Sequence, residues 1–180
     1  MTIHSSNEPQ EKIESIIVLF SHGQIQKALD SAQTLIKNYP NNPVLFNICG
    51  ACHASLGQLE EAIRKYRKSL AIMPDYAQAH NNLGIAIQEL GQLEEATNCY
   101  KKAIEIKPDY AEAYNNLGNI LKELKNFDEA INSYKRAIEI KPNYAEAHYG
   151  LGIIYQDLNL LNEAVKSLSL IHISEPTRPY

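Results

Sequence analysis

The sequence repeats itself every 34 residues, and this period limits the possible fold more than any other feature. Residues 77–110 and 111–144 are identical at 20 of 34 positions. A fixed period of this length is typical of arrays in which each repeat buries its apolar face only against its neighbours. The same spacing of 34 residues separates Pro40, Pro74, Pro108 and Pro142, and also Gly50, Gly84, Gly118 and Gly152.

Each repeat predicts a pair of helices. In residues 77–110 a first apolar series has helical spacing, Gly91 interrupts it, and a second series follows before Pro108. Proline clashes with the preceding turn, so it ends the second helix. Close packing of the second helix is expected at the recurring glycine, with the recurring alanine as the facing residue. The first series consists of Ala79, Leu83, Ile87 and Leu90.

Charged and capping residues agree with this pairing. Asp75, Asp109 and Asn143 each precede Gln or Glu by three residues, which is the spacing of a capping box before a first helix. Acidic pairs begin the second helices and basic pairs follow in later turns, as the helix dipole favours. We interpret the basic pairs as a solvated face. They are Arg67-Lys68, Lys101-Lys102 and Lys135-Arg136.

The period also divides the chain. We expect a disordered N-terminus at 1–8, a degenerate first repeat at 9–42, full repeats at 43–76, 77–110 and 111–144, a truncated repeat at 145–167, and a non-native tail at 168–180. Residues 168–179 resemble the translation of a transposon-end adaptor used in sequencing libraries. The alternative is that these residues belong to the natural protein. It is supported by Leu168 and Ile171, which fall on core positions of the repeat.

Composition excludes several classes of protein. The chain has 180 residues and a net charge of −4, which argues against a non-specific nucleic-acid binder. No apolar run approaches the roughly 18 residues that a membrane span needs. The longest N-terminal run, 16–20, is too short for a signal peptide, so a cytoplasmic location is expected.

The repeat resembles the tetratricopeptide repeat over residues 9–167. In the fourth repeat the family's pattern falls on Tyr114, Leu117, Gly118, Leu121, Ala130, Tyr134, Ala137 and Pro142. The resemblance implies an all-α fold, a right-handed superhelical solenoid of tandem antiparallel helix pairs. It also implies that the first helices line a concave groove, in which members of the family bind peptide segments or other proteins.

The family's register indicates which residues line that groove. The set is rich in amides, which both donate and accept hydrogen bonds and so suit a peptide backbone of any sequence. Asn82 and Asn116 resemble two rungs of the asparagine ladder in O-linked N-acetylglucosamine transferases, although Ile48 and Gly150 interrupt it. The alternative is that these amides are only solvated. The predicted groove residues are Asn47, Gln78, Asn81, Asn82, Gln88, Glu112, Asn115, Asn116, Asn119 and Lys122.

One short motif could indicate a haem or metal site. Cys49, Cys52 and His53 form a Cys-x-x-Cys-His pattern, which is typical of covalent haem attachment. The three residues share one helix face, so a zinc site is a further alternative, although no fourth ligand is evident. We favour packing in the core, since free cysteine behaves as a small hydrophobe. We therefore expect neither cofactor nor metal.

The sequence as a whole predicts a scaffold that interacts with proteins. It shows no nucleophile–base pattern and no phosphate-binding glycine loop, so we expect no enzyme. The expected partner is a protein or peptide, without nucleic acid or membrane, and self-association through an uncapped C-terminal end is possible. The alternative is the N-terminal, substrate-recruiting array of a larger enzyme, such as a glycosyltransferase, a sulfotransferase or an oxygenase.

Overall fold

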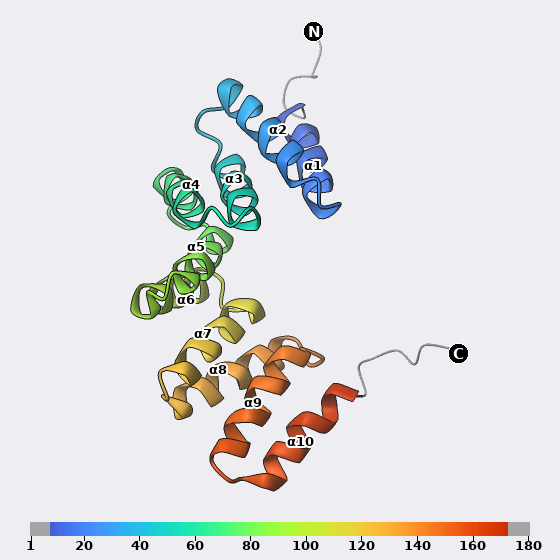
Figure 1. The fold of residues 1–180 in the computed structure, drawn as a ribbon, viewed down its shortest axis with the longest axis vertical. Coiled ribbons are helices and arrows are strands. Elements are labelled where there is room, and N and C mark those ends of the chain that lie inside the picture. Colours follow the sequence, from blue (N-terminus) through green and yellow to red (C-terminus); the bar gives the residue numbers. More distant parts are fainter. Residues whose placement is uncertain (1–7, 173–180) are drawn as a thin grey trace, which may run out of the picture. The chain divides into compact units, whose positions relative to one another are not determined.

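A computed structural model describes residues 8–172 of the chain (Figure 1). These residues form helices and no strand. The prediction that each repeat forms a pair of helices is confirmed. The chain divides into an N-terminal unit that ends at Cys99 and a C-terminal unit that begins at Tyr100. The helices are α1 (Glu8–Ser21), α2 (Ile25–Asn38), α3 (Pro43–Ser55), α4 (Leu59–Ile72), α5 (Ala77–Glu89), α6 (Leu93–Ile106), α7 (Ala111–Glu123), α8 (Phe127–Ile140), α9 (Ala145–Asp157) and α10 (Leu161–His172).

Each unit is held together by packing between helices that are consecutive in the chain. Within the N-terminal unit α1 to α5 pack in order, and within the C-terminal unit α7 to α10 do the same (Figure 1). The recurring alanines Ala28, Ala62 and Ala130 have no exposed area, because the neighbouring helix covers them. A helix of a repeat thus buries its apolar face on both neighbours.

The glycines Gly50, Gly118 and Gly152 of the first helices make room for a large side chain of the second helix. A Cβ atom added at Gly50 would lie 2.5 Å from Cε1 of Tyr66, and one at Gly118 would lie 2.8 Å from Cε1 of Tyr134. The expectation that an alanine faces this glycine is therefore wrong. The ring fills the space because a smaller facing residue would leave a void in the helix pair.

The expected capping boxes are also wrong. The first helices α5, α7 and α9 have Tyr76, Tyr110 and Tyr144 at the N-cap, one residue beyond Asp75, Asp109 and Asn143, and no side chain caps them. Only α3 has a side-chain cap among the first helices for which a cap is described, where Asn42 accepts hydrogen bonds from the amides of Val44 and Leu45. Of these N-cap tyrosines, Tyr144 is buried at 8% exposure, while Tyr76 and Tyr110 are half-buried.

Acidic pairs and basic pairs lie where the sequence indicated. Glu60-Glu61, Glu94-Glu95 and Asp128-Glu129 occupy the first turns of α4, α6 and α8. Arg67 and Glu95 form an exposed ion pair at 2.9 Å. Lys68, Lys101, Lys135 and Arg136 are exposed, as a solvated face requires.

The last helix runs past the expected end of the natural sequence. α10 continues to His172, and the Leu168 side chain faces Gly152 as Tyr134 faces Gly118. Its apolar residues Leu161 and Val165 are 60% and 67% exposed. The non-native origin of residues 168–180 stays a prediction, as does self-association through this helix. Residues 1–7 and 173–180 lie outside the described residues.

The turn inside each repeat needs one residue in the left-handed region. Gly57 and Gly91 have φ of 71° and 76°, while the corresponding Lys125 and Asn159 both have φ of 58°. An L residue with a Cβ atom is strained there, asparagine less so than lysine.

We therefore expect Lys125→Gly to raise the free energy of unfolding by about 1 kcal/mol, since glycine removes this strain. Urea denaturation of the full chain measures the change. Asn159→Gly should give a smaller gain, and Gly91→Ala a loss. A loss of stability in Lys125→Gly would contradict the assignment.

Candidate functional site

Three of the predicted groove residues meet in one notch of the N-terminal unit. Asn47 on α3 and Gln78 and Asn82 on α5 line a cavity of about 260 Å³. We call this cavity the α1–α3–α5 notch. Its remaining lining residues are Ile17 and Phe20 of α1, Val44, Ile48 and Ala51 of α3, and Tyr76 before α5. The notch is therefore built by first helices of three successive repeats.

The polar side of the notch is a hydrogen-bonded network. Nδ2 of Asn82 donates to Oδ1 of Asn47 at 3.1 Å, which links α5 to α3. The hydroxyl of Tyr76 donates to Oε1 of Gln78 at 3.4 Å. Burial raises the pKa of the Tyr76 phenol, and its hydrogen bond with Asn47 partly offsets this rise. The amides are thus held in place before any ligand arrives.

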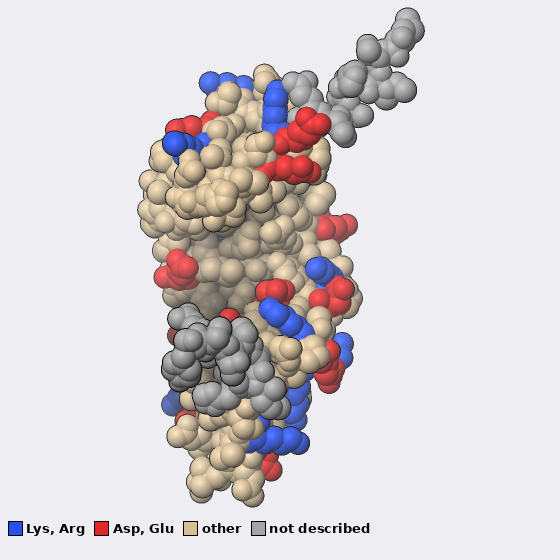
Figure 2. All heavy atoms as spheres, turned by 90° about the vertical axis from the view of Figure 1, so that its right-hand side faces the viewer, with Lys and Arg blue, Asp and Glu red and all other residues tan. Residues whose placement is uncertain are grey.

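The apolar side of the notch is partly open to solvent. Ile17 is 47% exposed although it lies beside Phe20 and Ile48. None of the nine lining residues carries a charge. In Figure 2 the upper part of the surface likewise shows broad uncharged areas, with acidic and basic residues scattered at their margins. An uncharged site with one apolar and one amide wall suits an extended peptide with an apolar side chain.

The C-terminal unit has the same positions with different residues. Two repeats further along, Val44, Asn47 and Gln78 correspond to Glu112, Asn115 and Glu146. Asn115 is 5% exposed, and its Oδ1 has no hydrogen-bond partner within the described part of the chain. The position that corresponds to Asn82, the donor to Asn47, is Gly150. The hydrogen bond that links α3 to α5 therefore has no counterpart between α7 and α9.

The other predicted residues differ in their placement. Asn81 is buried at 4% exposure, while Gln88, Asn116 and Lys122 are half-buried. Oδ1 of Asn119 accepts a hydrogen bond of 2.7 Å from the hydroxyl of Tyr134. Their role in binding stays a prediction, because they are spread over two units that are described separately.

Sequence reasoning missed the apolar wall of the notch. Ile17 has the same place in the repeat as Ala51 and Ile85, and Phe20 has the same place as Gln88. Extending the register back into the first repeat would have found both residues. They escaped notice because that repeat lacks the glycine and the aromatic residue of the pattern.

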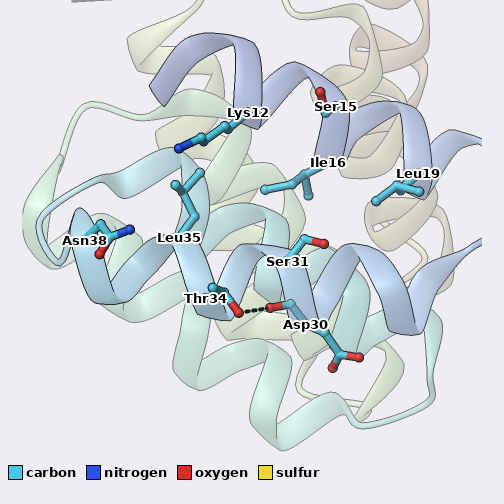
Figure 3. Close-up of a pocket in the computed structure, with 9 residues that line it drawn as sticks. All are labelled: Lys12, Ser15, Ile16, Leu19, Asp30, Ser31, Thr34, Leu35 and Asn38. Carbon is cyan, nitrogen blue, oxygen red and sulfur yellow. Dashed lines mark hydrogen bonds between the residues drawn. The ribbon is translucent and has the colours of Figure 1, made fainter. Parts of the chain in front are cut away.

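A larger cavity of about 480 Å³ lies between α1 and α2 (Figure 3). Two of its hydroxyl groups are bonded within the helices, since Ser15 donates to the Glu11 carbonyl and Thr34 to the Asp30 carbonyl. Of the corresponding residues of the next repeat, Phe46 and Ser69 are buried, whereas Arg64 and Lys68 are exposed. We therefore assign no ligand to this cavity. It is lined by Lys12, Ser15, Ile16, Leu19, Asp30, Ser31, Thr34, Leu35 and Asn38.

The Cys-x-x-Cys-His motif lies in the core. Cys49 and Cys52 have no exposed area, and Nδ1 of the buried His53 lies 2.6 Å from Oε1 of Gln58. Burial raises the pKa of each thiol to about 11, so both stay protonated at neutral pH. No group of three or more metal-ligating side chains is found among the described residues. This environment favours the packing role over haem or zinc.

Two histidines form hydrogen bonds to the turns between repeats. Nε2 of His80 donates to the Pro74 carbonyl at 2.9 Å, and Nε2 of His148 donates to the Pro142 carbonyl at 2.8 Å. Both rings therefore support the start of a first helix. Within the described residues, no helix is long and apolar enough to cross a membrane.

Comparison with known families matches the repeat itself. A family model described as TPR repeat matches residues 50–91, 88–125 and 118–159. A second model, described as Tetratricopeptide repeat, matches residues 17–42 and so includes the degenerate first repeat. A search of curated proteins gave no match.

Solved structures share the fold. A crystal structure of MamA is 26% identical, with a TM-score of 0.76, and the match covers 86% of this chain and 91% of that one. PilF of Pseudomonas aeruginosa is 16% identical, with a TM-score of 0.87 and coverage of 94% and 78%. A thermophilic TPR protein of Thermus thermophilus is 22% identical, with a TM-score of 0.77 and coverage of 94% and 92%. The fold is that of a protein-interaction repeat module.

Replacing Asn47 and Asn115 by leucine should have opposite consequences for stability. Asn47→Leu leaves the Asn82 amide unpaired and should cost about 1–3 kcal/mol. Asn115→Leu removes a buried acceptor that has no partner among the described residues, so we expect no loss or a gain of up to about 1 kcal/mol. Urea denaturation measures the free energy of unfolding of both variants. Equal losses would show that the two amides have equivalent surroundings.

The buried thiols should make the protein less stable in alkali. Their pKa is 9.0 when unperturbed and about 11 in the fold, so the unfolded chain loses protons first as pH rises. The stabilisation is complete below pH 9 and is lost as pH rises through about 11. We expect a fall on the order of 2 kcal/mol per thiol. In Cys49→Ala/Cys52→Ala the fall measured by urea denaturation should be shallower. An unchanged slope would contradict this assignment.

Proposed function

Because the chain belongs to the tetratricopeptide repeat family, we propose that it binds an extended peptide segment of a partner protein on the faces formed by its first helices. In the N-terminal unit this face is the α1–α3–α5 notch. The observation that carries the proposal is the meeting of Asn47, Gln78 and Asn82 with an exposed apolar wall. Amides that can both donate and accept suit a peptide backbone.

The proposed mechanism is binding to a prepared surface. The hydrogen bond between Asn82 and Asn47 fixes two of the amides before the ligand arrives. The peptide then bears most of the loss of conformational freedom, which lowers the cost of association. An apolar side chain of the peptide would cover Ile17 and Phe20, and burial of this area supplies the main favourable term.

We also propose that these faces bind without carrying out a reaction. The hydroxyls of Ser15 and Thr34 are bonded to helix carbonyls, and the thiols of Cys49 and Cys52 are buried and protonated. None of these groups is placed as an activated nucleophile would be. The proposal therefore expects capture of a peptide with no turnover.

A charge placed on the apolar wall should abolish binding at the notch. Peptides are first selected on the immobilised full chain from a phage-displayed library of random short peptides, and the most enriched sequence is made with a fluorescent label. Ile17→Glu puts a carboxylate into an uncharged cavity and should weaken its binding by about tenfold or more. Fluorescence anisotropy measures the affinity.

Val18→Glu is the matched control. Val18 is 52% exposed, is the next residue of α1 and does not line the notch. It should bind the peptide as the unmodified chain does, and circular dichroism should show both variants folded. Equal weakening in the two variants, or none in Ile17→Glu, would remove the notch from the binding site.

A further inference from the structure

The C-terminal unit contains a buried hydrogen-bond acceptor that the fold leaves unused. Asn115 is 5% exposed, and its Oδ1 has no partner within the described residues. Two repeats earlier, Oδ1 of Asn47 accepts a hydrogen bond from Asn82. A buried polar atom without a partner costs free energy, so its presence calls for an explanation.

The missing donor cannot be restored by a side chain at the same position. Gly150 stands where Asn82 stands in the N-terminal unit. A Cβ atom at Gly150 would lie 2.5 Å from Cζ of Tyr134, and the hydroxyl of this tyrosine donates to Asn119. The Tyr134 ring therefore keeps the position free of a side chain, so residue 150 supplies no donor to the buried acceptor on Asn115.

The surroundings of this acceptor are acidic. Glu112 and Glu146 are exposed and correspond to Val44 and Gln78 of the uncharged notch. Both carboxylates act on Tyr144, the buried N-cap residue of α9, whose pKa rises to about 12 through burial and, to a lesser extent, through these charges. Glu112 lies in the first turn of α7 and Glu146 in the first turn of α9, and these two helices contact one another.

Four cations of the same unit are relevant to this face. Nζ of Lys107 lies 4.9 Å from the centre of the Tyr110 ring, two residues before Glu112. Nζ of Lys141 lies 4.4 Å from the centre of the Tyr144 ring. Arg136 is paired with Glu139 on α8. Lys122 is half-buried in the last turn of α7, away from Glu112 in the first turn. These positions leave both carboxylates without a described ion pair.

We propose that the α7–α9 face of the C-terminal unit receives a lysine or arginine side chain of the bound peptide, with Asn115, Glu112 and Glu146 as its acceptors. The inference rests on the proposed function and adds a preference for residue type to it. Lysine and arginine carry only donors, and each of the three residues offers an acceptor oxygen. Hydrogen bonds between a cation and carboxylates are stronger than neutral ones.

Tyr149 adds a surface suited to the same ligand. It adjoins Gly150 and is 56% exposed, although the corresponding Asn115 is buried. An aromatic ring attracts a guanidinium or ammonium group to its face. A phosphate or a terminal carboxylate would instead meet two like charges. The chemistry therefore favours a basic peptide over an acidic one.

Peptide selection on the full chain tests the preference. The library of random short peptides is selected on the unmodified protein and on Glu112→Gln/Glu146→Gln, in which both substituted residues are exposed. Asp128→Asn/Glu129→Gln is the matched control, because it removes two acidic charges from α8 instead. We expect lysine and arginine to be enriched by the unmodified chain and the control, and this enrichment to be lost in Glu112→Gln/Glu146→Gln.

A pair of synthetic peptides then tests Asn115. One peptide has the most enriched sequence and the other has glutamine in place of its basic residue. Anisotropy should show about tenfold tighter binding of the basic peptide. Asn115→Leu should reduce that ratio, while circular dichroism shows that the variant is folded.

The outcomes separate the two proposals. Peptides that are selected and respond to Ile17→Glu, but show no preference for basic residues, would overturn this inference and leave the proposed function standing. A basic preference that persists in Glu112→Gln/Glu146→Gln and in Asn115→Leu would also overturn it. If no peptide is enriched, both proposals fail.

Discussion

The fit of a large side chain into the space above a glycine determines how each helix pair closes. Tyr66 packs on Gly50, Tyr134 packs on Gly118, and Leu168 does the same on Gly152. The approach is so close that a single added carbon atom would overlap the ring. Because this contact recurs in three repeats, the first helix packs on the second in the same way in each of them. The candidate sites include these first helices.

The repeat separates structural positions from variable ones. Recurring alanines and aromatic residues fill the core, and these positions change little along the chain. The exposed positions of the first helices change freely, from Val44 to Glu112 and from Asn82 to Gly150. One scaffold therefore carries an uncharged notch in one unit and an acidic face in the other. The proposed difference in ligand preference between the units would follow from these substitutions.

Most of the fold was predictable from the sequence, because periodicity is a local property that needs no knowledge of packing. The helix pairs and the role of Pro74 and Pro108 in ending the second helices follow from it directly. The caps were predicted wrongly because the capping-box spacing does not determine the residue at which a helix begins, and α5 and α9 have Tyr76 and Tyr144 at the N-cap. The partner of Gly50 was also wrong, since sequence spacing does not say which side chain reaches across a helix pair.

The candidate sites were predictable only in part. The register placed Asn47, Gln78 and Asn82 on one face, and the structure brings these three together. Their hydrogen bonds and the lone acceptor on Asn115 depend on side-chain geometry, which the pattern does not contain. Ile17 and Phe20 were missed because the first repeat departs from the pattern by which the others are aligned.

The central claim is that the first helices, and not the second, meet the partner. The most direct measurement is a comparison of amide chemical shifts of the labelled full chain with and without a selected peptide. We expect shifts concentrated on α1, α3, α5, α7 and α9, including the side-chain amides of Asn47 and Asn82. Shifts concentrated on α2, α4 and α8 would contradict it.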